Sequence, residues 1–249
     1  MKTLYYALAS SRYHKKFSIA YGLFFGLFLF LFTLLLNLKK MVLLLHTQVS
    51  SRIALIDAQL NENSASVPLD NHQVTQVSQV YQSLLYCFLG IFLFITILAL
   101  SFFFRYKKKE ILQWRLVGLK FREILRLLVV ESLLPAITVT FVVAAFLFVC
   151  QNTYESLLQT INLRVLHWLN VNDYTVLTQT TESHSFMIGL PFDQVTLFQV
   201  DFNDRFWFSD VFLAILKVFS AMALLTSIII SLLSTGFIKH WTKKGRWSM

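Results

Sequence analysis

The stretch SFFFRYKKKEILQWRLVGLKFREILRLLVVESLL, residues 101–134, decides how this chain folds. It contains eight of the 22 Lys and Arg residues of the chain. One apolar segment leads into it and another leads out of it. Because charged side chains avoid hydrocarbon, the stretch predicts a bend at a water interface between two membrane-spanning helices.

The bulk composition supports a membrane protein. The chain has 249 residues, of which 56% are hydrophobic and only 14% are charged. A soluble domain carries about 25% charged residues. The two cysteines, Cys87 and Cys150, lie in apolar segments, so we expect small hydrophobic side chains there rather than a disulfide framework.

Four segments are long and apolar enough to cross a hydrocarbon core, which takes about 20 helical residues. They cover residues 17–36, 84–104, 125–150 and 210–238. The first is longer than the apolar region of a signal peptide and lacks a small-residue cleavage site, so we expect it to remain as a span. The sequence therefore predicts an all-α membrane protein with four transmembrane helices.

The distribution of charge predicts the orientation in the membrane. Sixteen of the 22 Lys and Arg residues lie in or next to residues 1–16, 105–124 and 239–249, and ten of the 13 Asp and Glu residues lie in the other connections. By the positive-inside rule, both termini and the central segment are expected to be cytoplasmic. Nucleic-acid binding is not expected, because the basic excess follows topology. Lys39 and Lys40 lie on the opposite side, so either they snorkel to headgroups or the first helix ends elsewhere.

The first outer segment, residues 37–83, is predicted to form a short helical extracellular stalk. Apolar residues recur at spacings of three and four on both sides of the polar stretch NENSASVPLDN, whose Pro68 breaks a helix. The first two spans should therefore continue as a helical hairpin with a coiled-coil-like seam. The seam residues are Val49, Ile53, Ile56 and Leu60 on one side and Val74, Val77, Tyr81 and Leu84 on the other.

The second outer segment, residues 151–209, is predicted to be a small extracellular segment of mixed structure. Residues 153–171 fit an interfacial helix, and the later part contains β-leaning runs that could pair into a small sheet. Aromatic residues near the fourth span fit an interfacial belt better than a substrate pocket. The apolar helix face is Leu157, Leu158, Ile161, Val165 and Trp168, and the belt is Phe192, Phe198, Phe202, Phe206 and Trp207.

The central segment, residues 105–124, is expected to contain two helical pieces. One begins after the basic cluster, and Gly118 then permits a tight turn before a second, amphipathic helix. Such a helix can insert into a partner's groove or lie on anionic headgroups, and physical reasoning alone favours neither. Its apolar stripe is Phe121, Ile124, Leu125 and Leu128, and its charged face is Lys120, Arg122, Glu123 and Arg126.

The same region resembles the FtsX-like permease family, which includes the MacB, lipoprotein-releasing and bacitracin-type peptide-resistance permeases. The shared pattern is a basic cluster, Glu110-Ile111, an apolar step before Gly118, a polar pair and a later acid. Residues 7–26, ALASSRYHKKFSIAYGLFFG, also resemble the start of that family. In that family the bend is a coupling helix that fits a cleft in a cytoplasmic ATPase. The resemblance thus implies ATPase coupling by Glu110, Ile111, Gly118, Lys120, Phe121, Arg122 and Glu123.

The resemblance implies the permease subunit of a mechanotransmission-type ABC transporter in a bacterial plasma membrane. Partner ATPases would bind ATP and Mg, and the permease would form a homodimer or a heterodimer with a paralogue. Export, extraction or sensing of a peptide or amphiphile is expected, as in antimicrobial peptide resistance. The alternative is a signalling scaffold that relays ATPase state to an extracellular cell-wall enzyme. The outer segments, 37–83 and 151–209, depart from the family's usual lengths, which leaves the cargo open.

Several single residues are candidates for function. A carboxylate within a membrane helix has a functional role by default, and we expect Glu131 to meet basic residues of the central segment rather than Lys217. Pro135 would kink the third span and could act as a hinge. Gly22 and Gly26 permit close helix contact and are candidates for a dimer seam.

No catalytic set is visible in the sequence. It contains no Gly-rich phosphate loop, no nucleophile beside a base and no metal-ligand spacing. The chain is therefore expected to be a non-catalytic subunit that holds no cofactor or metal and lies among membrane lipids.

Overall fold

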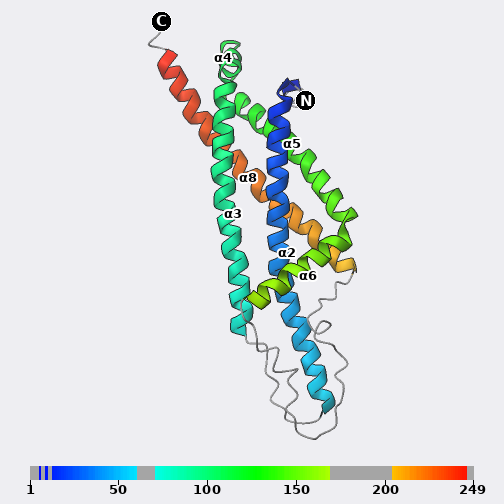
Figure 1. The fold of residues 1–249 in the computed structure, drawn as a ribbon. Coiled ribbons are helices and arrows are strands. Elements are labelled where there is room, and N and C mark those ends of the chain that lie inside the picture. Colours follow the sequence, from blue (N-terminus) through cyan, green and yellow to red (C-terminus); the bar gives the residue numbers. More distant parts are fainter. Residues whose placement is uncertain (1–5, 7–8, 11–12, 61–70, 169–203, 246–249) are drawn as a thin grey trace. The chain divides into compact units, whose positions relative to one another are not determined.

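The computed structural model describes residues 6, 9–10, 13–60, 71–168 and 204–245. The regular structure in these residues is helical throughout, which confirms the predicted all-α class for this part of the chain (Figure 1). The β-leaning runs between residues 173 and 202 lie outside the described residues. The six helices are α2 (Lys15–Leu60), α3 (Asn71–Tyr106), α4 (Lys108–Leu116), α5 (Phe121–Val149), α6 (Gln151–Trp168) and α8 (Asp204–Gly245).

Four of these helices are long and apolar enough to cross a membrane, as predicted. The candidate spans are Lys15–Leu45, Thr75–Tyr106, Phe121–Val149 and Ser209–Phe237. The first three, with 31, 32 and 29 residues, are longer than the predicted segments 17–36, 84–104 and 125–150, because the helix continues from the apolar run into flanking residues, whereas the fourth has the predicted length of 29 residues. A chain with four such helices is a multi-pass membrane protein by length and composition.

The chain divides into two compact units. The first unit contains Met1–Thr33, Cys87–Val149 and Phe212–Met249, and the second contains Leu34–Tyr86 and Cys150–Val211. The central bend and its partners all belong to the first unit.

Aromatic residues hold α2 against α3 in the first unit. Phe25, Phe28 and Phe32 recur at spacings of three and four, which places them along one face of α2. All three rings lie within 6.5 Å of the ring of Phe92 on α3, measured between centroids. Phe92 itself is fully buried. The abundance of Phe in the first two apolar runs thus serves helix packing as well as contact with lipid.

Two glycines of α2 let α5 approach closely in the first unit. A Cβ at Gly26 would overlap the side chain of Val139, and a Cβ at Gly22 would lie 3.1 Å from Cγ2 of the same valine. The expected close helix contact is therefore made within the chain. We do not retain the dimer-seam role for Gly22 and Gly26, because α5 already occupies the face they expose.

The second unit contains the helices predicted for the outer hairpin. α2 continues to Leu60 and α3 begins at Asn71, so both flanks of the polar stretch are helical, as expected. Val77 and Tyr81 of the predicted seam are buried, whereas Leu84 is 40% exposed and does not belong to it. Pro68 and the side chains of Val49, Ile53, Ile56, Leu60 and Val74 lie outside what the structure describes.

The prediction of a helix after the third span is confirmed, but its buried face differs. In α6 the most deeply buried residues are Tyr154, Leu158 and Asn162, spaced four apart. Leu157 and Trp168 of the predicted face are exposed instead. The sequence pattern does not predict burial of the two polar residues, because their partners lie on other helices. Asn37 Nδ2 donates to the Tyr154 hydroxyl at 3.0 Å. The Tyr81 hydroxyl donates to Asn162 Oδ1 at 3.3 Å.

The anomalous lysines after the first apolar run have partners in the second unit. Lys39 Nζ donates to Gln82 Oε1 at 2.9 Å, and Lys40 Nζ lies 2.5 Å from Asp210 Oδ1. α2 continues past both residues to Leu60, so the helix itself does not end at residue 36.

Candidate functional site

The candidate site is the elbow, which we define as residues 105–124 between α3 and α5. Lys107 alone separates α3 from α4. At the end of α4, the Gly118 amide donates to the Arg115 carbonyl and the Leu119 amide donates to the Trp114 carbonyl, each at 3.1 Å. Gly118 has φ +92°, the left-handed conformation that ends many helices in this motif. The predicted turn at Gly118 is therefore present, and its positive φ is a conformation that glycine adopts without steric cost.

The restart of the helix is also locally specified. The Lys120 amide donates to Glu123 Oε2 at 3.0 Å, so a carboxylate at the third helical position satisfies an amide that has no partner within the helix. Ile124 and Leu128 of the predicted stripe are buried, and Phe121 and Leu125 are half-buried. The charged face of Lys120, Arg122, Glu123 and Arg126 is exposed, as predicted.

We call the buried base of the elbow, around Lys107, Ile111 and Ile124, its root. A hydrophobic cluster within the first unit holds this root in place. Ile111 of α4 and Ile124 of α5 are each 1% exposed. They belong to one buried cluster with residues from the last turns of α3 and from the interior of α8, so four helices meet at the base of the bend. The buried cluster is Leu100, Phe103, Phe104, Ile111, Ile124, Leu128, Ile229 and Ile230. Such contacts make the root move together with the spans.

A buried ion pair closes the root on its polar side. Lys107 is 1% exposed and Glu131 of α5 is 4% exposed. The ammonium of Lys107 contacts Glu131 Oε1 directly, and it lies 4.9 Å from the ring centroid of Phe103. The expectation that Glu131 meets a basic residue of the central segment, rather than the exposed Lys217, is confirmed. Because each charge is desolvated, each depends on the other for stability.

The N-terminal segment ties into the same pair. Ser10 Oγ donates to Glu131 Oε1 at 2.9 Å, and Lys107 Nζ donates to Ser10 Oγ at 2.7 Å. One turn later, His14 Nε2 lies 3.3 Å from Glu110 Oε2. Glu110 is also 3.8 Å from Lys107 Nζ. Residues from the segment before α2, from the α3–α4 junction, from α4 and from α5 thus form one polar cluster.

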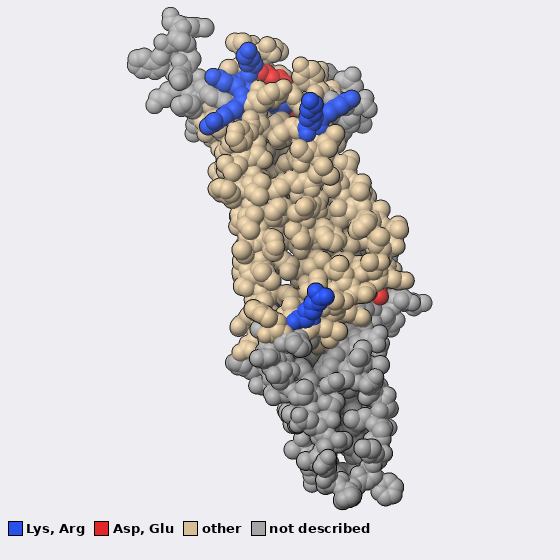
Figure 2. Space-filling view, in the orientation of Figure 1, with Lys and Arg blue, Asp and Glu red and all other residues tan. Residues whose placement is uncertain are grey.

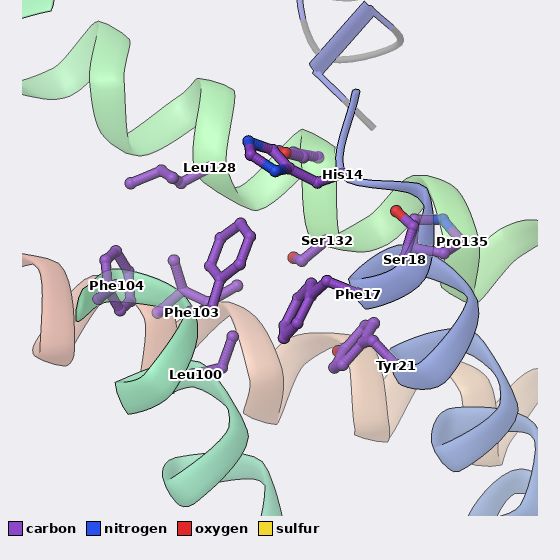
Figure 3. Close-up of a pocket in the computed structure, with 12 residues that line it drawn as sticks. His14, Phe17, Ser18, Tyr21, Leu100, Phe103, Phe104, Leu128, Ser132 and Pro135 are labelled. Carbon is purple, nitrogen blue, oxygen red and sulfur yellow. The ribbon is translucent and has the colours of Figure 1, made fainter. Parts of the chain in front are cut away.

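A small cavity lies beside this cluster. Figure 3 shows His14, Phe17 and Tyr21 facing Phe103 and Leu128 across it. The cavity has a volume of about 10 Å³, near the minimum for one water molecule. Glu131 lines it, and its Oε2 has no hydrogen-bond partner among the described residues. The site therefore has room for a water, but not for a substrate.

The tip of the elbow is exposed and apolar. Leu116 is 87% exposed, Val117 is 82% exposed and Leu119 is 41% exposed. Exposed basic residues surround the tip, and Figure 2 shows Lys and Arg gathered at this end of the first unit. The nearest in sequence are Arg115, Lys120 and Arg122. Adjacent apolar side chains that are largely exposed within a basic rim are typical of a protein contact.

The structure separates the predicted coupling residues into two groups. Gly118, Lys120, Arg122 and Glu123 are exposed near the tip. Ile111 is buried, Phe121 is half-buried, and Glu110 faces His14 and Lys107, so we assign these three to the root and not to a direct docking surface. Pro135 lies inside α5 beside Gly22.

Sequence reasoning missed several residues of the site. In the sequence, Lys107 is one member of a basic cluster, yet Phe103, Lys107 and Ile111 are spaced four apart and share a buried face. Ser10 and His14 are likewise four apart and meet Glu131 and Glu110. The sequence pattern identifies Leu116 and Val117 only as an apolar step before Gly118 and does not indicate their exposure. Helical spacing was the available signal for Lys107.

No family model, no curated protein and no solved structure matches this chain. Within the described ranges, no three His, Cys, Asp or Glu side chains are grouped so as to hold a metal ion. The site is thus characterised by its geometry: a buried, ion-paired root and an exposed apolar tip with a basic rim.

Proposed function

We propose that this chain is the permease subunit of a mechanotransmission-type ABC transporter. Its elbow docks onto a cytoplasmic ATPase that binds ATP and Mg, and the permease dimerises with itself or with a paralogue in a bacterial plasma membrane, with both termini cytoplasmic. The transported or sensed molecule is a peptide or amphiphile at the outer leaflet. The resemblance to FtsX-like permeases supplies this class, and the elbow supplies the physical support.

The observation that carries the proposal is the contrast between the two ends of the elbow. Leu116 and Val117 are almost fully exposed, while Ile111 and Lys107 are each 1% exposed. A loop that only bound headgroups would need basic side chains but no buried anchor. A fixed root below an apolar tip is what force transmission needs, because a rigid connection passes displacement on to the spans.

The path of force follows the contacts of the first unit. A partner that moves the tip would move α4 and the start of α5 together, because Ile111 and Ile124 belong to one buried cluster. The same cluster contains Phe104 at the end of α3 and Ile230 of α8. The pair between Lys107 and Glu131 adds a polar connection to α5. Three spans would therefore respond to one displacement.

The chemistry of the tip specifies the surface it fits. Leu116 and Val117 would fill an apolar pocket, and Lys120 and Arg122 would face carboxylates at its rim. Apolar centres with charged rims are common in protein interfaces, where the rim contributes mainly to orientation and association rate. The partner should therefore present a small apolar cleft bordered by Asp or Glu.

A photo-crosslinker at the tip tests the proposal. p-Benzoylphenylalanine replaces Val117 in the full chain, expressed in its native cells, and covalent adducts are identified by mass spectrometry. We expect an adduct with an ABC ATPase. The matched control is Val149, which is 86% exposed at the other end of α5. The 29 residues of α5 span about 43 Å, more than the ~30 Å hydrocarbon core, so the control lies across the membrane.

The purified complex provides the second readout. Val117→Glu should abolish co-purification of the ATPase, because it places a carboxylate in the apolar pocket, whereas Val149→Glu should not. Adducts only to lipid at position 117, or equal ATPase adducts at both positions, contradict the docking assignment. Stimulation of ATP hydrolysis by added peptides separates transport from relay of ATPase state.

A further inference from the structure

We propose that a groove at the start of α2 is a binding site for one anionic phospholipid. The groove lies in the first unit and has a volume of about 590 Å³. Two adjacent lysines and several aromatic residues line it, from the segment before α2, from α2 itself and from the end of α3. The residues that carry the argument are Tyr13, Lys15, Lys16, Phe17, Phe102 and Tyr106.

The position of the groove corresponds to a membrane surface. Lys15 is the first residue of the candidate span Lys15–Leu45, and Tyr106 is the last residue of Thr75–Tyr106. Two spans therefore end at the groove, which places it where hydrocarbon meets water. Tyr13 is 83% exposed and Tyr106 is 76% exposed, and tyrosine is enriched at this depth because its ring is apolar and its hydroxyl is polar.

The charge of the groove selects an anion. Lys15 and Lys16 are exposed, and neither makes an ion pair with a carboxylate within the described part of the chain. Among the residues that the structure describes, none of those lining the groove carries a carboxylate. Two uncompensated ammonium groups attract a lipid phosphate and repel a choline, even though the aromatic rings alone could accept a quaternary ammonium.

The apolar wall selects a lipid over a free phosphate. Phe102 is 68% exposed and lies one turn of α3 deeper in the span than Tyr106. A phosphate ion would leave this wall against water. The first carbons of an acyl chain would cover it and would remove apolar surface from contact with polar headgroups. The positive charge of the groove, its aromatic lining and its place at the ends of two spans therefore all favour a single phospholipid as the ligand.

The site does not depend on the docking of a partner at the elbow tip. His14 also lines the groove and contacts Glu110 of α4. A bound lipid would therefore lie next to the N-terminal part of the elbow root, at a distance from Leu116 and Val117 along the chain. A failure of lipid binding would leave the ATPase proposal intact, and the reverse also holds.

Native mass spectrometry of the full chain in detergent tests the site. The chain is titrated with phosphatidylglycerol and, separately, with phosphatidylcholine. The variant Lys15→Gln/Lys16→Gln should weaken phosphatidylglycerol binding by about 10- to 30-fold, because each lysine near an anionic headgroup contributes a several-fold effect. Lys15→Arg/Lys16→Arg should retain binding, which also shows that these positions tolerate substitution without loss of the fold.

The matched control is Lys108→Gln/Lys109→Gln, a second adjacent and exposed lysine pair that does not line the groove. It should change phosphatidylglycerol binding less than about threefold, since it leaves the local charge of the groove unchanged. Equal losses in both double variants would overturn the site, as would equal affinity for phosphatidylcholine. Complete displacement of the lipid by inorganic phosphate would show a free-phosphate site and would also overturn the proposal.

Discussion

Lys107 and Glu131, 24 residues apart in sequence, form a buried ion pair that joins the α3–α4 junction to α5. The lysine has no exposed side-chain surface and the carboxylate is 4% exposed. A buried pair of this kind contributes less net stability than its attraction implies, but removal of one partner leaves an uncompensated charge. This asymmetry makes the root of the elbow open to test.

Glu131→Gln should lower the stability of the chain by up to ~3–5 kcal/mol, because it leaves the buried Lys107 ammonium with only the more distant Glu110 carboxylate, at 3.8 Å, as a charge partner. Thermal unfolding in detergent micelles, followed by circular dichroism, measures the change. Glu155→Gln is the control, since an amide oxygen there can still accept from Gln151 as Glu155 Oε1 does at 3.2 Å. The double variant Lys107→Met/Glu131→Leu should recover most of the loss, and a strictly additive double loss would argue against direct coupling.

Ser10→Ala should release the N-terminal segment. The Ser10 hydroxyl accepts from Lys107 and donates to Glu131, so its loss removes two hydrogen bonds to charged groups and costs about 2 kcal/mol. Limited trypsin digestion should then cut more rapidly after Lys15 or Lys16. Ser18→Ala, eight residues further along and within α2, is the comparison variant. Unchanged digestion rates in Ser10→Ala would mean that the segment is held by other contacts.

Gly26→Ala should destabilise the chain although alanine is the better helix former. A Cβ at Gly26 would overlap Val139, and overpacking of this kind costs ~1–3 kcal/mol. Gly90→Ala is the matched control because nothing lies within 4 Å of a Cβ there, and it should be neutral or stabilising by up to ~1 kcal/mol. Val139→Ala should suppress the Gly26→Ala defect in thermal unfolding, and the absence of suppression would place the clash elsewhere.

Gly118→Ala should disturb the turn of the elbow and leave its root intact. The residue has φ +92° with no neighbour within 4 Å, so the penalty is conformational and amounts to about 1 kcal/mol. Gly118→Asn should be milder, because asparagine tolerates the left-handed region. The relevant measurement is co-purification with the ATPase partner, which should fall in the order glycine, asparagine, alanine. Equal co-purification of all three would show that docking does not depend on the turn.

Alkaline pH should destabilise the second unit through Tyr154. Burial raises the pKa of Tyr154 from 10.0 to about 12, and the hydrogen bond from Asn37 lowers it by less. As pH rises, Tyr154 therefore ionises in the unfolded chain before it ionises in the folded one. The contribution of the neutral, buried Tyr154 hydroxyl to the stability of the fold is fully present below pH 10 and is lost as pH rises through about 12. In Tyr154→Phe, the loss of stability over this range should be smaller by up to ~2 kcal/mol. Identical pH profiles would contradict the burial of this hydroxyl.

The elements of the fold were largely predictable, because long apolar runs and basic connections leave few other arrangements for a membrane chain. The elbow followed from Gly118 and from the stripe around Ile124. The sequence predicts that the partner of Glu131 is a basic residue of the central segment, but it does not predict which one, since that segment contains several lysines. Which of them is buried depends on packing, and Lys107 lies between Phe103 and Ile111 on the face that meets α5.

Contacts between residues far apart in the sequence could not be predicted. Ser10 and Glu131 are separated by 121 residues, and no periodic pattern links two such distant positions. Gly22 and Gly26 carried a correct signal for close contact, but sequence alone could not distinguish a helix of the same chain from one of a second copy. Tyr154 and Asn162 interrupt an apolar pattern, so the sequence predicts the buried face of α6 at neighbouring, more hydrophobic residues.

The order in which the cluster's members are synthesised has a consequence for biogenesis. Ser10 emerges from the ribosome first, Lys107 much later, and Glu131 only when the third span is being made. Until then the ammonium of Lys107 has no carboxylate from α5 and cannot settle in its apolar surroundings. The root of the elbow can therefore close only after α5 has been synthesised, because Lys107 lacks until then the carboxylate that it contacts directly in the folded protein.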